Sequence, residues 1–365
     1  MDWQEHRLSR RLALTAETTE HIYSFIAEID AVRNSWRLTN RLMPQIIERL
    51  MQSVLVTSTG ASNRIEGNRL TDEEVQSLYK NMRIRRLATR DEQEVAGYLD
   101  VLQCVFENYS EMPLSESIIL QLHRDMLRHS DKDAGHLGHY KVGPNRVEAK
   151  DASGNIVGVI FDPTPPYLVP IEMKQLCAWY EWAIAKSFKH PLIVTANFIF
   201  EYLAIHPFQD GNGRTSRILT NLLLLRHGYA FATVASHERI VEESKAEYYL
   251  ALNRTQRTWK TEQEDISPWL AFIFEVFRKQ ASRALQLLEE DQTELLLSEK
   301  QLALWRWAQN VPEEVFSPRM AVQATGFPVR TVEDIIKKLS AMNKLERTGL
   351  GRGTRYRVKA SPRKA

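Results

Sequence analysis

Apolar residues recur every three or four positions along most of the chain, and this spacing places them on one face of an α-helix. The pattern is clear at residues 40–62, 171–188 and 191–208. No run reaches the 18 or more apolar residues that a membrane-spanning helix requires. The sequence therefore predicts a mainly α-helical body that does not cross a membrane.

Residues 139–162 break this helical pattern. The segment is rich in glycine and proline and holds short β-prone runs on both sides of residues 151–155, DASGN, a sequence typical of a turn. We therefore expect a β-hairpin that projects from the helical body.

A new pattern of elements begins near Ser298. Ser298 is suited to open a helix, and Gly326 is suited to end one. The predicted elements are helices at 297–310, 317–327 and 328–343, followed by strand, Gly-rich turn and strand at 344–358. This order resembles a winged helix-turn-helix.

Charge is distributed unevenly along the 365 residues. Residues 298–365 carry 14 Lys and Arg and 6 Asp and Glu, a net charge of +8, whereas the whole chain carries +2. A basic module of this kind can meet an anionic partner such as DNA. The length allows two or three domains. We expect an N-terminal helical region (1–110), a helical core (111–283), a helical connector (284–297) and the C-terminal module (298–365).

Two further observations concern the cellular compartment. The first 25 residues lack the apolar stretch of a signal peptide. Cys104 and Cys177 lie far apart and form no CxxC pair, so neither a disulfide framework nor a zinc site is predicted. The sequence predicts a cytoplasmic protein without a membrane partner.

The candidate chemistry lies in HPFQDGNGRTSR, residues 206–217. DGNG favours a tight turn, and the apolar run after it predicts a helix whose first N–H groups can bind an anion. Arg214 and Arg217 share one helix face and are suited to a polyphosphate. Asp210 could hold Mg²⁺ between phosphates. His206 could act as a base near neutral pH.

These twelve residues resemble the signature of the Fic family of nucleotidyl-transferring proteins, H-P-F-x-(D/E)-G-N-G-R-x-x-R, without a departure. The resemblance implies that His206 deprotonates a hydroxyl group, which attacks the α-phosphate of ATP so that AMP is transferred. It implies that Asp210 holds the Mg²⁺ cofactor. The residues to which it assigns the binding of the ATP phosphates are Gly211, Asn212, Gly213, Arg214 and Arg217.

The resemblance also gives roles to two neighbouring segments. Fic proteins carry a β-hairpin flap before the motif, which positions the target backbone as an added strand, and residues 139–162 lie in that place. The helix after the motif often supplies a tyrosine to the adenine site. The candidates here are Tyr248, Tyr249 and Asn253. The implied partner is a protein with a Ser, Thr or Tyr hydroxyl, including this chain itself.

A second motif precedes the first, in ASNRIEGNRLT at residues 61–71. Ser62 and Glu66 share one helix face, and Gly67 is suited to end that helix. An acid is disfavoured at this helix end, which points to a cationic partner. In the Fic family the pattern (S/T)-x-x-x-E-(G/N) is inhibitory. The resemblance implies a class II protein, in which Glu66 pairs with Arg217 and prevents productive ATP binding.

Several alternatives stay open at this point. In some relatives the same glutamate positions a water that removes AMP, so the physiological reaction could be de-AMPylation. A nucleotide-sensing regulator that binds DNA through residues 298–365 would use the same core. Another nucleotide, phosphate or phosphocholine donor would keep the fold. The sequence specifies neither the target nor whether the chain forms a homodimer.

Overall fold

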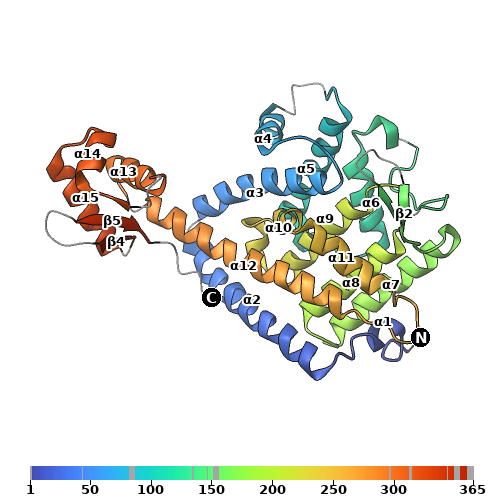
Figure 1. The fold of residues 1–365 in the computed structure, drawn as a ribbon. Coiled ribbons are helices and arrows are strands. Elements are labelled where there is room, and N and C mark those ends of the chain that lie inside the picture. Colours follow the sequence, from blue (N-terminus) through green and yellow to red (C-terminus); the bar gives the residue numbers. More distant parts are fainter. Residues whose placement is uncertain are drawn as a thin grey trace. The chain divides into compact units, whose positions relative to one another are not determined.

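The protein is mainly helical and divides into two compact units, Met1–Leu285 and Gln286–Ala365 (Figure 1). The computed structural model describes residues 2–42, 44–81, 87–133, 135–145, 147–150, 156–295, 297–311, 315–342, 344–348 and 354–359. The expected mainly α-helical fold is confirmed.

The first unit consists of helices and one β-hairpin. Its helices are α1 (Arg7–Arg10), α2 (Ala16–Leu42), α3 (Pro44–Ile65), α4 (Asp72–Asn81), α5 (Arg90–Asn108), α6 (Glu116–Leu127), α7 (Val169–Ala185), α8 (Pro191–Ile205), α9 (Asn212–Arg226), α10 (His237–Glu243), α11 (Lys245–Gln256) and α12 (Ser267–Leu295). Short 3-10 helices lie at Tyr109–Glu111, Asp131–Asp133, Pro166–Leu168 and Ala230–Thr233. The helix α12 continues past Leu285, so most of the expected connector, 284–297, is the last part of this long helix.

The centre of the first unit is formed by α8 and α9 (Figure 1). Residues 192–205 of α8 are all buried, because α7 and α9 pack against this helix and it is apolar on nearly every side. The start of α9 is different, since its first turns bury the polar residues Asn212, Arg214 and Arg217. Two buried guanidinium groups require hydrogen-bond or ion-pair partners, so the α8–α9 junction is a candidate site.

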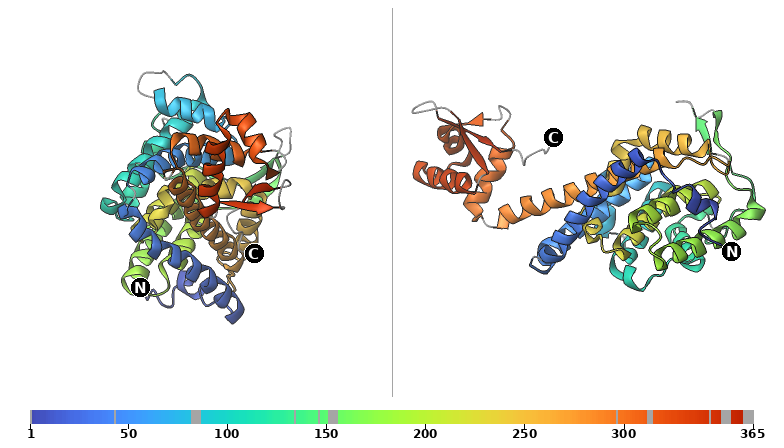
Figure 2. Two further views of the ribbon diagram at one scale, coloured as in Figure 1. Left: turned by 90° about the vertical axis from the view of Figure 1, so that its left-hand side faces the viewer. Right: turned by 90° about the horizontal axis from the view of Figure 1, so that it is seen from below.

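The predicted hairpin is present at the edge of the first unit (Figure 2). Strands β1 (Val147–Lys150) and β2 (Ile156–Phe161) pair antiparallel, with Val147 opposite Phe161 and Lys150 opposite Ile156. The predicted turn, 151–155, lies outside the described residues.

Within its described residues, the second unit carries the end of α12, three further helices and a three-stranded sheet of order β3-β5-β4. Its elements are α13 (Glu299–Gln309), β3 (Val315–Phe316), α14 (Pro318–Thr325), α15 (Val329–Ala341), β4 (Leu345–Thr348) and β5 (Arg355–Val358). Ser298 opens α13 and Gly326 ends α14 with a φ of 69°, as the sequence indicates. The strand β3 was not predicted. The order of elements agrees with the expected helices and hairpin, and the winged-helix identity stays a prediction.

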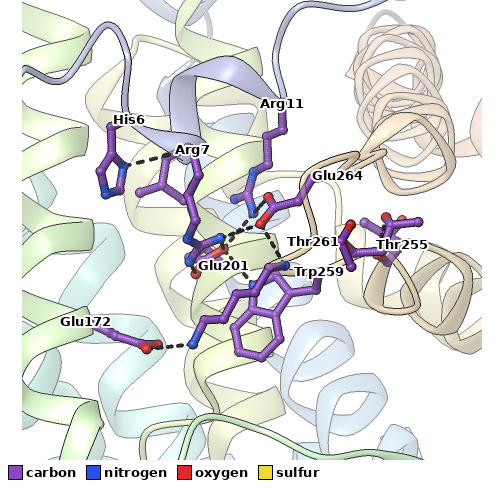
Figure 3. A network of polar contacts seen from close by, with 12 residues as sticks. His6, Arg7, Arg11, Glu172, Glu201, Thr255, Trp259, Thr261 and Glu264 are labelled. Atoms are coloured by element: carbon purple, nitrogen blue, oxygen red, sulfur yellow. Dashed lines mark hydrogen bonds and ion pairs between the residues drawn. The ribbon is translucent and has the colours of Figure 1, made fainter.

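A buried network of charges attaches the N-terminal helix α1 to α8 (Figure 3). Arg7 and Arg11 both pair with Glu201 of α8 and with Glu264, the latter at 3.0 and 3.2 Å. Arg11 also donates to Asn197 at 2.6 Å. Burial opposes ionisation of Glu201, but the two arginines outweigh it and lower its pKa to about 2. These ion pairs therefore hold α1 against α8.

Two simpler findings complete the description. Among the described residues, every helix is too short or too polar to cross a membrane. Cys104 is exposed and Cys177 is partly buried, and both are free thiols.

Candidate active site

The loop between α8 and α9 carries the candidate base in an unusual backbone conformation. His206 ends α8 with φ 54° and ψ 61°, and its N–H donates to the Tyr202 carbonyl at 3.0 Å. A left-handed conformation at a residue with a Cβ costs on the order of 1–3 kcal/mol and persists where surrounding bonds hold it. The chain thus turns sharply at His206 and directs the following loop back toward the start of α9.

The protonation of His206 suits a base. Its Nδ1 lies 3.3 Å from the Leu203 carbonyl oxygen, which can only accept, so Nδ1 carries the proton and Nε2 carries the lone pair. Burial, together with the charge of Lys141, lowers the pKa of His206 to about 4. The imidazole is therefore neutral at pH 7 and can accept a proton at Nε2.

Internal hydrogen bonds hold the loop closed. The Asn212 side chain accepts from the Phe208 N–H and donates to its carbonyl, both at 2.8 Å. Phe208 is fully buried and stacks on His123 with ring centres 3.6 Å apart. The His123 Nδ1 accepts from the Gly138 N–H, so Nε2 donates to the Asp210 carbonyl at 3.1 Å. The Asn212 side chain thus holds the loop, and its expected part in phosphate binding falls to its backbone.

The first turn of α9 has the features of an anion site. Gly211 adopts φ 80°, and the helix begins at Asn212 with backbone N–H groups at the positive end of the dipole. A Cβ added at Gly213 would lie 2.3 Å from Glu66 Oε1, so a larger residue here would displace the Glu66 carboxylate. Nε of Arg214 and Nη1 of Arg217 are buried, and among the described residues they have no hydrogen-bond acceptor, whereas Nη1 of Arg214 lies 3.6 Å from a carboxylate oxygen of Glu94. Buried donors of this kind indicate a missing acceptor, such as a phosphate oxygen.

Asp210 lies beside this anion site. Its side chain is 37% exposed, and Oδ1 accepts from the Gly211 N–H at 2.6 Å and lies 3.4 Å from Arg214 Nη2. Burial opposes ionisation, but Arg214 and the Gly211 N–H outweigh it and lower the pKa of Asp210. The described residues contain no cluster of three or more metal-binding side chains. One ionised carboxylate beside a phosphate site fits Mg²⁺, which commonly takes one or two carboxylates together with phosphate oxygens and water.

The second motif meets the first at the end of α3. The N–H groups of Gly67 and Asn68 donate to the carbonyls of Arg64 and Asn63, a Schellman ending in which Gly67 has φ 99°. This ending places the Glu66 carboxylate 2.7 Å from Nη2 of Arg217.

Arg217 is held along its whole length by the same motif. Its Nε donates to Ser62 Oγ at 2.7 Å, and Nη2 donates to the Ser62 carbonyl at 3.0 Å. The Arg217 side chain is 5% exposed and that of Glu66 36%. Loss of water contact opposes ionisation of Glu66, but Arg217 outweighs it, so the pKa of Glu66 lies below its usual value. The pair is therefore charged at neutral pH.

A buried carboxylate supports this arrangement from behind. Glu238 of α10 is fully buried and accepts hydrogen bonds from Ser58 of α3 (2.8 Å), Tyr98 of α5 (3.1 Å) and Asn221 of α9 (2.6 Å), and also from Ser236. Three helices that form the site therefore meet at one side chain. The role of Glu238 as a shared acceptor could not be predicted from the sequence, because most of its partners come from distant segments.

The adenine candidates lie on α11. Tyr248 is 6% exposed and packs against Tyr249, with ring centres 5.2 Å apart. Burial raises the pKa of both phenols, that of Tyr249 to about 12, and the charges of Arg217 and Glu66 also act on them. The structure thus brings both tyrosines to the side of the Arg217–Glu66 pair. Asn253 lies further along α11 and is partly exposed.

Part of the chain is similar to proteins of a known family. Residues 113–224 match the model of the Fic/DOC family. The protein adenylyltransferase Fic of Nematostella vectensis is 29% identical over 220 residues, which cover 58% of this chain and 44% of that protein. The protein adenylyltransferase fic-1 of Caenorhabditis elegans is 26% identical over 212 residues, which cover 57% and 38%. The match thus spans less than half the length of these relatives.

Solved structures show the same fold. A Fic family protein from Desulfovibrio desulfuricans G20 superposes with a TM-score of 0.61 at 23% identity, over 96% of this chain and 98% of that one. Residues 134–508 of fic-1 from Caenorhabditis elegans give 0.58 at 20% identity, over 75% and 74%.

Proposed function

We propose that the protein is an adenylyltransferase that transfers AMP from ATP to a hydroxyl group of a protein, and the match of residues 113–224 to the Fic/DOC family model supports this. The observation that carries the proposal is the neutral His206 beside a helix start with unsatisfied arginine donors. The names of the relatives, both protein adenylyltransferases, support the choice of AMP as the transferred group.

The reaction assigns one step to each group. Nε2 of His206 takes the proton of the target hydroxyl, whose oxygen then attacks the α-phosphorus of ATP. The bond from that phosphorus to the bridging oxygen breaks, and pyrophosphate leaves with the negative charge. Arg214 and Arg217 would stabilise the charge on the phosphates, because their buried N–H groups lie in a site of low dielectric constant. Asp210 would hold Mg²⁺, which would neutralise phosphate charge.

Glu66 would keep this enzyme inactive. Its carboxylate accepts a hydrogen bond from Nη2 of Arg217. That donor would then not be available to the γ-phosphate of ATP. Removal of Glu66 would leave a buried arginine ready for the phosphate. Glu66 is 36% exposed, so solvent screens part of the attraction between the two charges. A change of about 1.4 kcal/mol corresponds to about tenfold in rate, and we expect a rise of at least that size.

The test is intact-protein mass spectrometry after incubation with ATP and Mg²⁺. We expect an AMP adduct on Glu66→Gly protein, little or none on the unaltered protein, and none on the double variant with His206→Ala. Equal modification of the unaltered protein and Glu66→Gly would contradict the inhibition. Modification that survives His206→Ala would contradict the base.

A target protein already carrying AMP separates transfer from removal. If the unaltered protein releases the AMP and Glu66→Gly does not, the physiological direction is de-AMPylation, with Glu66 holding the attacking water.

A second candidate function belongs to residues 298–365, and exposed basic side chains favour it. Arg330 and Lys337 on α15 are exposed. Arg347 on β4 is exposed as well and stands opposite Tyr356 of β5, so both side chains lie on the same face of the sheet. A groove of about 430 Å³ between these elements is lined by residues that include Glu333, Lys337, Arg347 and Tyr356. We propose that this face binds the phosphate backbone of duplex DNA.

Fluorescence anisotropy with a labelled duplex tests the DNA proposal. The logarithm of the binding constant should fall linearly with the logarithm of salt concentration. Arg347→Ala with Lys337→Ala, both at the groove, should lower the slope by about 2, since each phosphate contact contributes roughly 0.9. Arg283→Ala, an exposed arginine of the first unit, is the control. The absence of binding at low salt would rule out this function.

A further inference from the structure

Lys141 lies in the loop that precedes β1 and is only 4% exposed. Its backbone N–H donates to the Pro207 carbonyl at 2.9 Å. Its Nζ donates to the Ile205 carbonyl at 3.3 Å and to Asn145 Oδ1 at 2.6 Å. Asn145 in turn donates from Nδ2 to the Phe208 carbonyl at 2.8 Å. One lysine and one asparagine thus bind three carbonyls of the catalytic loop.

These three carbonyls belong to residues on both sides of His206 in the chain. Ile205 precedes the histidine, and Pro207 and Phe208 follow it. Because His206 has φ 54°, its backbone would relax if the peptide groups beside it were free to turn. Hydrogen bonds on both sides resist that turn. Those of Lys141 and Asn145 come from the segment that leads into the hairpin, and they add to the bonds that Asn212 of α9 makes to Phe208.

The buried ammonium group of Lys141 is unusual, because buried lysines usually pair with a carboxylate. The acceptors of Lys141 Nζ are the neutral oxygens of Asn145 and Ile205, and within the described part of the chain it forms no ion pair. Burial lowers the pKa of Lys141 to about 8, so most of the population still carries the full set of donors at pH 7. The charge is retained where it serves two acceptors at once.

We propose that Lys141, with Asn145, is a positioning residue that holds the imidazole of His206 where it can accept the proton of the target hydroxyl. This inference rests on the proposed function, since it takes His206 as the base. The role needs a donor that reaches both acceptors. Arginine meets that need, whereas methionine has similar length and no donor.

Kinetics on the Glu66→Gly background test the role. Lys141→Met should lower the rate of AMP transfer at saturating ATP by about tenfold or more, because small displacements of a reacting group are costly. The ATP concentration for half-maximal rate should change less than about twofold, because the phosphate groups bind on α9. Lys141→Arg should recover most of the rate. Lys174→Met, at an exposed lysine of α7, is the matched control.

Backbone hydrogen exchange over residues 203–212 provides a readout that needs no AMP transfer. Lys141→Met should speed exchange of the loop amides about tenfold, while the interiors of α8 and α9 keep their protection. Asn145→Ala should act alike, and the double variant should add little. Unchanged loop exchange, an unchanged rate, or a parallel loss of ATP binding would each overturn the inference. If the Glu66→Gly parent transfers no AMP but Lys141→Met speeds exchange of the loop amides as expected, the proposed function is wrong. The role of Lys141 in holding the loop is then retained.

Discussion

At the scale of single residues, the depressed pKa of His206 has a direct kinetic consequence. A general base works only when unprotonated, so activity is lost as the pH falls through its pKa. We expect kcat/KM of the Glu66→Gly variant to hold level from pH 8 to pH 6 and to fall with a midpoint near pH 4, where burial and Lys141 place the pKa of His206. Steady-state assays over this range, with melting curves at each pH, check it. A midpoint near 6.5, the usual value for histidine, would contradict the assignment.

The sequence predicted the residues of the motif because they are adjacent in the chain and their chemistry is complementary. It missed His123 and Lys141, which support the loop from other segments. Neither stands in a pattern of its own. The histidine lies on α6 and the lysine precedes a hairpin. Only folding brings their side chains to the carbonyls of residues 205–210, so no local pattern predicts their role.

At the scale of elements, ion pairs fix helix α3, which carries the candidate inhibitory motif, to α10 and α4. Arg64 donates to Glu242 at 2.6 Å and to Asp72 at 2.9 Å, two residues before Glu66. Arg64→Ala should cost about 1–3 kcal/mol of stability, since bonds between charged partners are lost. The end of α3 should then fray, and auto-modification should rise several-fold, to a level below that of Glu66→Gly.

Time courses by intact mass spectrometry, together with denaturant unfolding, check the prediction for α3. Arg69→Ala is the matched control, because Arg69 is exposed and lies just beyond the helix end. Equal rises in both variants, or no rise with Arg64→Ala, would show that α3 does not control the site through these contacts.

Local patterns predicted most elements, including the hairpin strands and the cap at Gly326. They failed where no local signal exists. The two-residue strand β3 is defined by its partner β5, and α12 continues through 284–295 because nothing in that segment ends a helix.

At the scale of the whole molecule, all residues of the candidate catalytic and inhibitory motifs lie in the first unit, and the exposed basic face lies in the second. The sequence indicated this separation through the jump in net charge after residue 298. It did not indicate that residues 1–285 form one compact unit, because the contacts between the N-terminal region and the core join positions that are far apart in the chain. The pair of Arg217 and Glu66, 151 positions apart, is one of them.

The network around Glu201 sets the order in which the protein can fold. Arg7 and Arg11 are synthesised long before Glu264, with which they pair and which lies 257 and 253 positions later. Contacts of such long sequence separation form late, and chains of this size fold through intermediates. Until Trp259 and Glu264 have been made, Glu201 lacks its indole donor, and the two arginines lack their second carboxylate. Helix α1 is therefore among the last elements to dock, and a chaperone that holds this helix during synthesis would delay closure of the core.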